Sequence, residues 1–288
     1  MLINGVVTES NLGRFTVVDA VQQRTGQNFS QNKKRPMSKV IAFAGKGGVG
    51  KTTVASLVIR HLSINAKTPI LAVDADPNSN LGETLGLEVT TTVGDIRENF
   101  MRDPQGVPSG MDKTIYLESL VEQALIEKPE FDLLVMGRQE GQGCYCMVNN
   151  ILHNFTEKLT ANYNYMVVDN EAGMEHLSRR TSGQVDILYL VTDYSLRGLR
   201  ALRRIHDMLD GLKLKVQEMG IIVTRAPEEL SDVFLAEVDE IGVPIVATIP
   251  NDPALLDFDM EKRSLLELPD DSPAVTAIDH LLTESCPA

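Results

Sequence analysis

A glycine-rich segment lies between an apolar run at residues 40–44 and a second apolar stretch at residues 54–59. Its residues are Gly45, Lys46, Gly47, Gly48, Val49, Gly50, Lys51, Thr52 and Thr53. This order predicts a buried strand, a tight turn and a helix, and the glycines let several backbone N–H groups approach a phosphate at the helix N-terminus. Lys51 supplies a cation for the β- and γ-phosphates, and the Thr52 hydroxyl suits Mg²⁺. The segment therefore predicts a binding loop for a nucleoside triphosphate.

The same glycines also fit the fingerprint of dinucleotide-binding turns. Gly45, Gly47 and Gly50 have its spacing, and an acidic residue, Asp74 or Asp76, follows at a compatible distance. A dinucleotide turn has no use for the lysine and threonine that end the loop, whereas a triphosphate needs both a cation and a magnesium ligand. We therefore favour the triphosphate site.

Lys46 directly follows the first glycine of the loop, which departs from the general P-loop pattern. The string from Lys46 to Thr53 closely resembles the deviant loop of the MinD, ParA and nitrogenase-iron-protein group of ATPases. The resemblance implies Mg²⁺-dependent ATP hydrolysis by a homodimer that encloses two ATP molecules, with catalytic roles for Lys51 and for Lys46, which reaches the partner's nucleotide. The simpler alternative is that Lys46 is a solvated surface lysine.

Apolar runs alternate with amphipathic stretches along the chain, which is typical of a doubly wound, mostly parallel α/β sheet. The predicted strands are 40–44, 70–74, 132–136, 165–169, 187–192, 219–224 and 245–249. The predicted helices are 51–62, 118–127, 147–159, 199–212, 230–241 and 274–282. Because the strand runs are continuously apolar, helices should cover both faces of the sheet. We expect a MinD-like P-loop ATPase domain over residues 38–288.

Residues 1–37 differ from this pattern. They form a polar N-terminal extension that is rich in Gln and Asn toward its end. A true extension, a misassigned start and a weakly ordered arm are all compatible with this composition. We assign the segment no function.

The net charge indicates which partners to expect, and the number of cysteines indicates the cellular compartment. The net charge of −13 speaks against binding to nucleic acid and to anionic membranes. No apolar run approaches the length of a membrane span. Three cysteines are too few for a disulfide scaffold and favour a reducing compartment, so we expect a cytoplasmic protein.

Carboxylates follow two of the predicted strands, at the sheet edge that should also carry the phosphate loop. One strand leads into Asp74 and Asp76, and another into Asp169 and Gly173. These segments resemble the two switches of the same ATPase group, which implies that Asp76 activates the attacking water, Asp169 holds Mg²⁺ through a water, and Gly173 is a hinge. Glu171 stands where that group usually has proline. The alternative is that a strand-end Asp only caps the next helix.

The nucleobase site can be placed only by resemblance. Arg225 and Pro250 lie where the group builds its adenine pocket. By this resemblance we expect both residues to contact the bound ATP.

Cys144 and Cys146 form a Cys-x-Cys pair with glycines before it. Two thiolates do not complete a tetrahedral metal site, but a twofold axis near the pair would supply two more from a second copy. Soft thiolates select zinc, nickel, copper(I) or iron–sulfur units. Incidental, inert cysteines remain the alternative.

The wider sequence around this pair resembles the CooC-type nickel-insertion ATPases of carbon monoxide dehydrogenase and acetyl-CoA synthase maturation. The resemblance rests on residues 141–150 together with residues 169–177. It implies that the cysteine pairs of two subunits bind nickel, or zinc in its place, and that ATP-dependent dimerisation controls delivery to such an enzyme. His153 and His176 are weaker candidates for further ligands.

Two other functions fit the loop. One is an electron donor or iron–sulfur carrier resembling the nitrogenase iron protein, although that family spaces its cluster cysteines far apart. The other is a positioning ATPase resembling MinD or ParA. That role would call for a basic C-terminal helix, but residues 274–288 contain no Lys or Arg.

Overall fold

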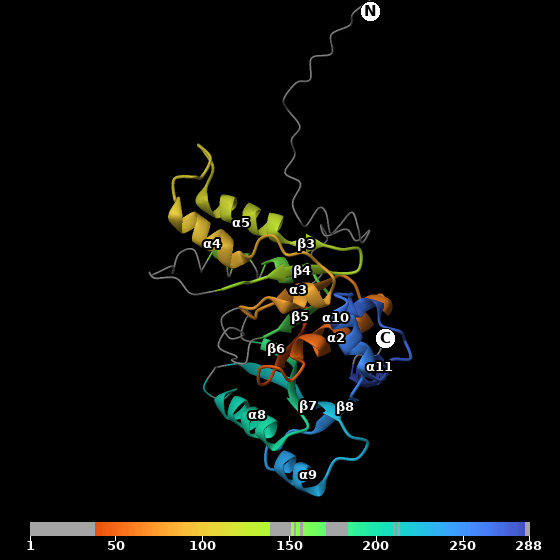
Figure 1. The fold of residues 1–288 in the computed structure, drawn as a ribbon. Helices are drawn as coiled ribbons and strands as arrows, with labels where there is room; N and C mark the ends of the chain where they lie inside the picture. Colours follow the sequence, from red (N-terminus) through yellow and green to blue (C-terminus); the bar gives the residue numbers. More distant parts are fainter. Residues whose placement is uncertain are drawn as a thin grey trace, which may run out of the picture. The chain divides into compact units, whose positions relative to one another are not determined.

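A computed structural model of the protein describes residues 38–138, 151–152, 154–155, 158–170, 184–209, 211 and 214–285. These residues form an eight-stranded sheet in the order β3-β4-β2-β5-β1-β6-β7-β8 (Figure 1). The strands are β1 (Lys39–Ala44), β2 (Ile70–Asp74), β3 (Ile126–Glu127), β4 (Asp132–Val135), β5 (Tyr165–Asp169), β6 (Gln184–Asp193), β7 (Lys215–Ala226) and β8 (Ile245–Pro250). Neighbouring strands pair in parallel except β3 and β4, which are antiparallel.

Helices connect the strands, as a parallel sheet requires. They are α2 (Lys51–Ile64), α3 (Asn80–Thr84), α4 (Val93–Arg102), α5 (Lys113–Ala124), α8 (Leu196–Leu209), α9 (Asp232–Asp239), α10 (Pro253–Met260), the 3₁₀ helix η2 (Leu265–Glu267) and α11 (Pro273–Ser285). The doubly wound, mostly parallel α/β fold predicted from the sequence is confirmed.

The central strand β1 decides where the functional edge lies. It pairs with β5 on one side and with β6 on the other. The chain runs from β1 through α2 to β2 on the β5 side, but from β6 through α8 to β7 in the opposite direction, so the direction of the connections reverses between β1 and β6. In such sheets ligands bind at the carboxyl ends of the strands where this reversal occurs. The loop after β1 stands at that point.

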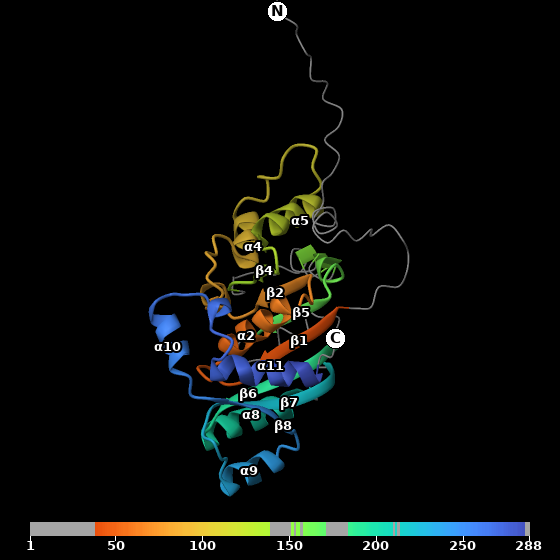
Figure 2. The ribbon, with the colours of Figure 1, turned by 90° about the vertical axis from the view of Figure 1, so that its right-hand side faces the viewer.

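Both faces of the sheet are covered. On one face, Ile41 and Phe43 of β1 belong to a core cluster that includes α2 and α11 residues (Figure 2). On the other side of β6 and β7 lies α8, which buries Leu199 and Leu202 (Figure 1). The apolar strand runs are therefore enclosed by helices, which explains why they do not alternate with polar residues.

The structure corrects the bounds of two predicted helices. The helix predicted over residues 199–212 begins earlier, because α8 spans Leu196–Leu209. The helix predicted over residues 118–127 is wrong at both ends, because α5 spans Lys113–Ala124 and the short strand β3 follows it. Asp112 fixes the earlier start by accepting the N–H of Thr114 at 2.8 Å. Of the helix predicted over 147–159, the described residues 151–152, 154–155 and 158–159 are helical.

Candidate functional site

The loop between β1 and α2 depends on glycine at three positions. Gly48 and Gly50 have φ values of 78° and 93°, in the left-handed region that favours glycine. A Cβ on Gly45 would lie 2.1 Å from the carbonyl oxygen of Val191 in β6, so only glycine permits this close approach. The loop is thereby pressed against the neighbouring strand at the sheet edge.

Lys51 is the first residue of α2 and is buried. Its Nζ donates to the carbonyl oxygens of Gly45 at 3.1 Å and Lys46 at 3.2 Å. The first turn of α2 contains no acidic residue, so the positive end of the helix dipole is not neutralised there. Lys46 is exposed. Cation, helix end and loop amides together make this a favourable place for a polyphosphate.

Thr52 and Asp169 meet across the sheet edge. The Thr52 hydroxyl donates to Asp169 Oδ2 at 2.6 Å, whereas the buried Oδ1 has no hydrogen-bond partner in the described part of the chain. Burial raises the pKa of Asp169 to about 6, although the Thr52 hydrogen bond and Lys51 oppose this. A hydroxyl beside a carboxylate with a vacant oxygen is a hard donor set, and it fits Mg²⁺.

Asp74 and Asp76 extend this acidic region in different ways. Asp74 accepts the N–H groups of Asp76 at 3.0 Å and Leu81 at 2.9 Å, so it holds the turn after β2 and the start of α3. Burial raises the pKa of Asp74 to about 7. Asp76 accepts the N–H of Asn78 at 2.8 Å. The helix-capping alternative therefore describes Asp74 well, while Asp76 is half-buried at the turn.

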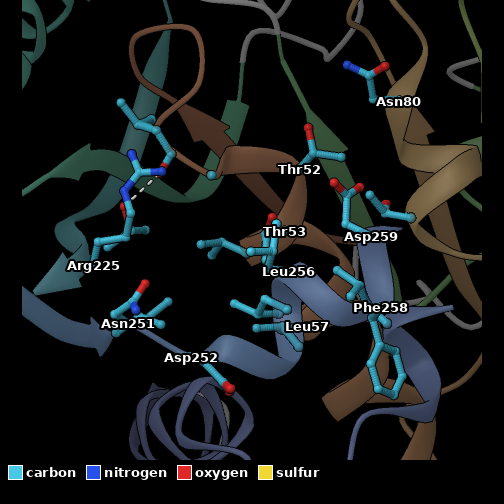
Figure 3. Close-up of a pocket in the computed structure, with 18 of the residues that line it drawn as sticks. Thr52, Thr53, Leu57, Asn80, Arg225, Asn251, Asp252, Leu256, Phe258 and Asp259 are labelled. Atoms are coloured by element: carbon cyan, nitrogen blue, oxygen red, sulfur yellow. Dashed lines mark hydrogen bonds between the residues drawn. The ribbon is translucent and has the colours of Figure 1, made fainter. Parts of the chain in front are cut away.

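A cavity of about 550 Å³ opens beside the loop (Figure 3). Its walls come from α2, α3, α10 and the ends of β7 and β8, and include Thr52, Thr53, Arg225, Pro250 and Asn251. The cavity thus connects the phosphate loop with the segments predicted to bind the nucleobase. That role of Arg225 and Pro250 stays a prediction.

Arg225 also contacts the phosphate loop and β6, which the sequence did not suggest. Its guanidinium donates to the Gly48 carbonyl oxygen at 3.1 Å and lies 3.6 Å from Asp193. Its φ of 50° is a left-handed conformation that is strained for arginine. The side chain therefore braces the tip of the phosphate loop.

Sequence reasoning missed two polar residues that support the cavity. The Thr224 hydroxyl lies 2.7 Å from the carbonyl oxygen of Val49 and 3.2 Å from that of Thr192, joining the loop to β6 and β7. Asp252 accepts the N–H of Ala254 at 3.0 Å, and its other oxygen accepts from α11. The Asp-Pro pair before α10 is a helix-start signal that could have identified Asp252.

Several predicted residues lie outside the described part of the chain. They are Cys144, Cys146, His153, Glu171, Gly173 and His176. Within the described residues no cluster of three or more His, Cys, Asp or Glu side chains could hold a metal ion. No described helix is both long and apolar enough to cross a bilayer.

The chain resembles known proteins over most of its length. The profile of the CobQ/CobB/MinD/ParA nucleotide binding domain matches residues 40–265. The chain belongs to this family. It is a nucleotide-binding P-loop ATPase, as the sequence predicted.

Two proteins of similar sequence and one solved structure of similar fold can be named. The uncharacterized ATP-binding protein MJ0685 of Methanocaldococcus jannaschii is 40% identical over 244 residues, which cover 84% of this chain and 96% of that one. The carbon monoxide dehydrogenase accessory protein CooC of Rhodospirillum rubrum is 29% identical over 189 residues, covering 61% and 70% of the two chains. The structure of MinD from Pyrococcus horikoshii, complexed with Mg-ADP, superposes with a TM-score of 0.64 at 21% identity, covering 87% and 97%.

Proposed function

We propose that this ATPase is a metallochaperone that uses ATP-dependent dimerisation to bind nickel and deliver it to a carbon monoxide dehydrogenase or acetyl-CoA synthase. Two facts support the proposal: the similarity to CooC, which covers more than half of the chain, and the Cys144–Cys146 pair. Zinc would occupy the same thiolates in place of nickel.

The observation that carries the proposal is the sheet edge shared by the nucleotide site and the strand that leads to the cysteines. The N–H of Met136, just after β4, donates to the carbonyl oxygen of Asp74 at 2.8 Å. Asp74 also holds the N–H of Asp76. The chain that runs on from β4 to the cysteine pair therefore starts beside the proposed first switch.

Each residue of the site has a role in this mechanism. The loop amides and Lys51 bind the β- and γ-phosphates, while Thr52 and Asp169 would hold Mg²⁺. The bound ion would neutralise charge on the phosphate oxygens. Asp76 orients the water that attacks the γ-phosphorus, the bond from that phosphorus to the bridging oxygen breaks, and ADP and phosphate leave.

Dimerisation links this chemistry to the metal. The exposed Lys46 reaches the nucleotide of the partner subunit, so ATP holds the two subunits together. Cys144 and Cys146 of both subunits then supply four thiolates to one nickel ion. Coupling requires that the metal prefers one nucleotide-bound form, because a ligand without differential affinity shifts no equilibrium. Loss of the γ-phosphate, sensed through Asp169 and Gly173, releases the pair.

The decisive experiment is titration of reduced protein with Ni²⁺ and Zn²⁺, with and without ATP. We expect one tightly held ion per dimer in the wild type and none in Cys144→Ser. Cys286→Ser is the matched control and should bind as the wild type does. ATP hydrolysis should persist in Cys144→Ser, since the thiols take no part in phosphoryl transfer.

Stoichiometric nickel binding in Cys144→Ser would refute the cysteine site. Equal loss in the Cys286 variant would show that the pair has no special role. Visible absorbance of the protein after anaerobic purification would instead support the iron–sulfur alternative.

A further inference from the structure

Helix α8 carries a row of arginines on its solvent-facing side. Its buried side consists of Gly198, Leu199, Leu202, Ile205 and Leu209, which pack toward the sheet. The opposite side carries an arginine row at i, i+3 and i+7, a spacing that keeps side chains on one face of a helix. We define this row as the arginine stripe: Arg197, Arg200 and Arg204, all exposed.

The part of the chain that the structure describes does not pair the stripe with carboxylates. Among the described residues, none of its three arginines takes part in an ion pair, whereas the adjacent Arg203 pairs with Glu240 at 2.7 Å. Like charges three or four residues apart on a helix destabilise it. The stripe therefore works against the stability of its own helix.

The surroundings of the stripe exclude an extended polyanion. The chain has a net charge of −13, so only a local positive strip is available. Helix α9 packs against α8 (Figure 1). Exposed carboxylates nearby are Asp232 and Asp239 of α9, Glu240 just after it, and Asp207 of α8 itself. A nucleic acid or an anionic membrane would meet these carboxylates as well as the arginines. A compact partner can contact the strip alone.

The side chains of the strip match a protein partner. Arginine binds carboxylates through two parallel hydrogen bonds, which gives geometric specificity as well as charge. Two apolar side chains, Leu196 and Met208, are 36% and 47% exposed at the ends of the same helix. Arginine and methionine are enriched in protein interfaces, whereas lysine, absent from α8, is depleted there.

We infer that the exposed face of α8 is a docking surface for a protein partner that presents a row of carboxylates. The stripe from Arg197 to Arg204 covers about 10 Å at 1.5 Å per residue, so a matching partner is a helix or strand with acidic side chains at similar spacing. The three arginines do not line the cavity beside the phosphate loop, and the inference does not depend on the proposed cargo.

The test uses a fluorescent helical peptide with glutamates at i, i+3 and i+7, and the same peptide with glutamines as its control. Binding to the full chain is followed by anisotropy at low and at high salt. We expect the wild type to bind the glutamate peptide, with affinity reduced at least about tenfold in Arg197→Gln/Arg200→Gln/Arg204→Gln. The matched variant Arg102→Gln/Lys113→Gln/Lys128→Gln removes the same charge elsewhere and should bind like the wild type.

The thermal midpoint provides a second readout. Loss of repulsion along α8 should leave the stripe variant as stable as the wild type or slightly more so, and ATP hydrolysis should be unchanged. Equal peptide binding by both triple variants, or no binding by the wild type, would overturn the inference. Stripe-dependent binding of duplex DNA or of phosphatidylglycerol vesicles that is tighter than binding of the peptide would overturn it in favour of a polyanion.

Discussion

The two sides of the nucleotide site differ in how completely their polar groups are satisfied. On the loop side, Lys51 and Arg225 donate to loop carbonyls, and the Thr224 hydroxyl bridges Val49 and Thr192. On the carboxylate side, Asp169 has a buried oxygen without a partner among the described residues. Burial holds the pKa values of Asp74 and Asp169 at about 7 and about 6.

This contrast separates a preformed half from a half that needs a cation. The side chains on the loop side already have hydrogen-bond partners within the protein, so we expect this half to be preformed. The carboxylate side concentrates negative charge at a cost in stability that a bound Mg²⁺ would offset. Substitutions on the two sides should therefore differ in how their effects depend on Mg²⁺.

The largest effect is expected from Lys51→Ala. The buried ammonium is the predicted cation for the transferred phosphate, so kcat should fall at least about 100-fold. Steady-state phosphate release at saturating Mg-ATP measures this. Lys113→Ala, an exposed lysine at the start of α5, is the control and should be unaffected. Unchanged turnover in Lys51→Ala would place the active site elsewhere.

Asp169→Asn should separate activity from stability. Hydrolysis should fall about 100-fold because the magnesium ligand is weakened. At pH 8 with EDTA, however, the free energy of unfolding should rise by about 1–3 kcal/mol, since a buried charge has been removed. Urea unfolding measures the change, and Mg-ATP should stabilise only the wild type appreciably. A variant less stable than the wild type in EDTA would contradict the contrast between the two sides.

The pH dependence of stability sharpens the same point. The Asp74 carboxyl ionises near pH 4 in the unfolded chain but near pH 7 in the folded protein. Between these values the folded state binds more protons than the unfolded chain. The contribution of Asp74 to the free energy of unfolding is therefore lost as the pH rises from about 4 to about 7. We expect a decrease of about 2–4 kcal/mol from this group in EDTA.

Comparing Asp74→Asn with the wild type tests whether Asp74 causes this decrease. Its unfolding free energy, measured in urea at several pH values, should vary less than that of the wild type over the same window. Parallel curves for the two proteins would show that Asp74 is not the titrating group.

The smallest effect is expected from Thr224→Val on the loop side. Removing the hydroxyl leaves the carbonyls of Val49 and Thr192 without this donor, which should cost about 1 kcal/mol and lower Tm by about 2–4 °C. Because this half is preformed, the loss should be the same with and without Mg-ATP. Thr248→Val, on the exposed side of β8, is the matched control. A loss of stability that appears only in the presence of Mg-ATP would contradict the distinction between the two sides of the site.

The sequence predicted most of the sheet because its strands are long, continuous apolar runs between turn residues. Thus β2 and β5 begin and end at the predicted residues. The helices α4 and α10 were missed because their apolar periodicity is short. Their start signals were present, since Thr92 and Asp95 form a capping box and a proline follows Asp252.

The site was predicted unevenly for a physical reason. Glycines, Lys51 and Thr52 are contiguous, so their shared purpose can be seen in the sequence alone. The hydrogen bond from Thr52 to Asp169 joins residues 117 positions apart, and the one from Thr224 to Val49 joins residues 175 positions apart. Such contacts depend on strand order, which one sequence does not specify.

Asp252 has a consequence for the predicted ATP complex. One of its oxygens accepts the N–H of Ala254 at the start of α10, while the other accepts hydrogen bonds from Ser272 and from the first turn of α11, which packs on α2. The α10 wall of the cavity is thereby linked to the helix that begins at the phosphate loop. In the predicted complex this link would set the spacing between the nucleobase and the β-phosphate. Recognition of the γ-phosphate would then depend on the turns that carry Asp76 and Asp169.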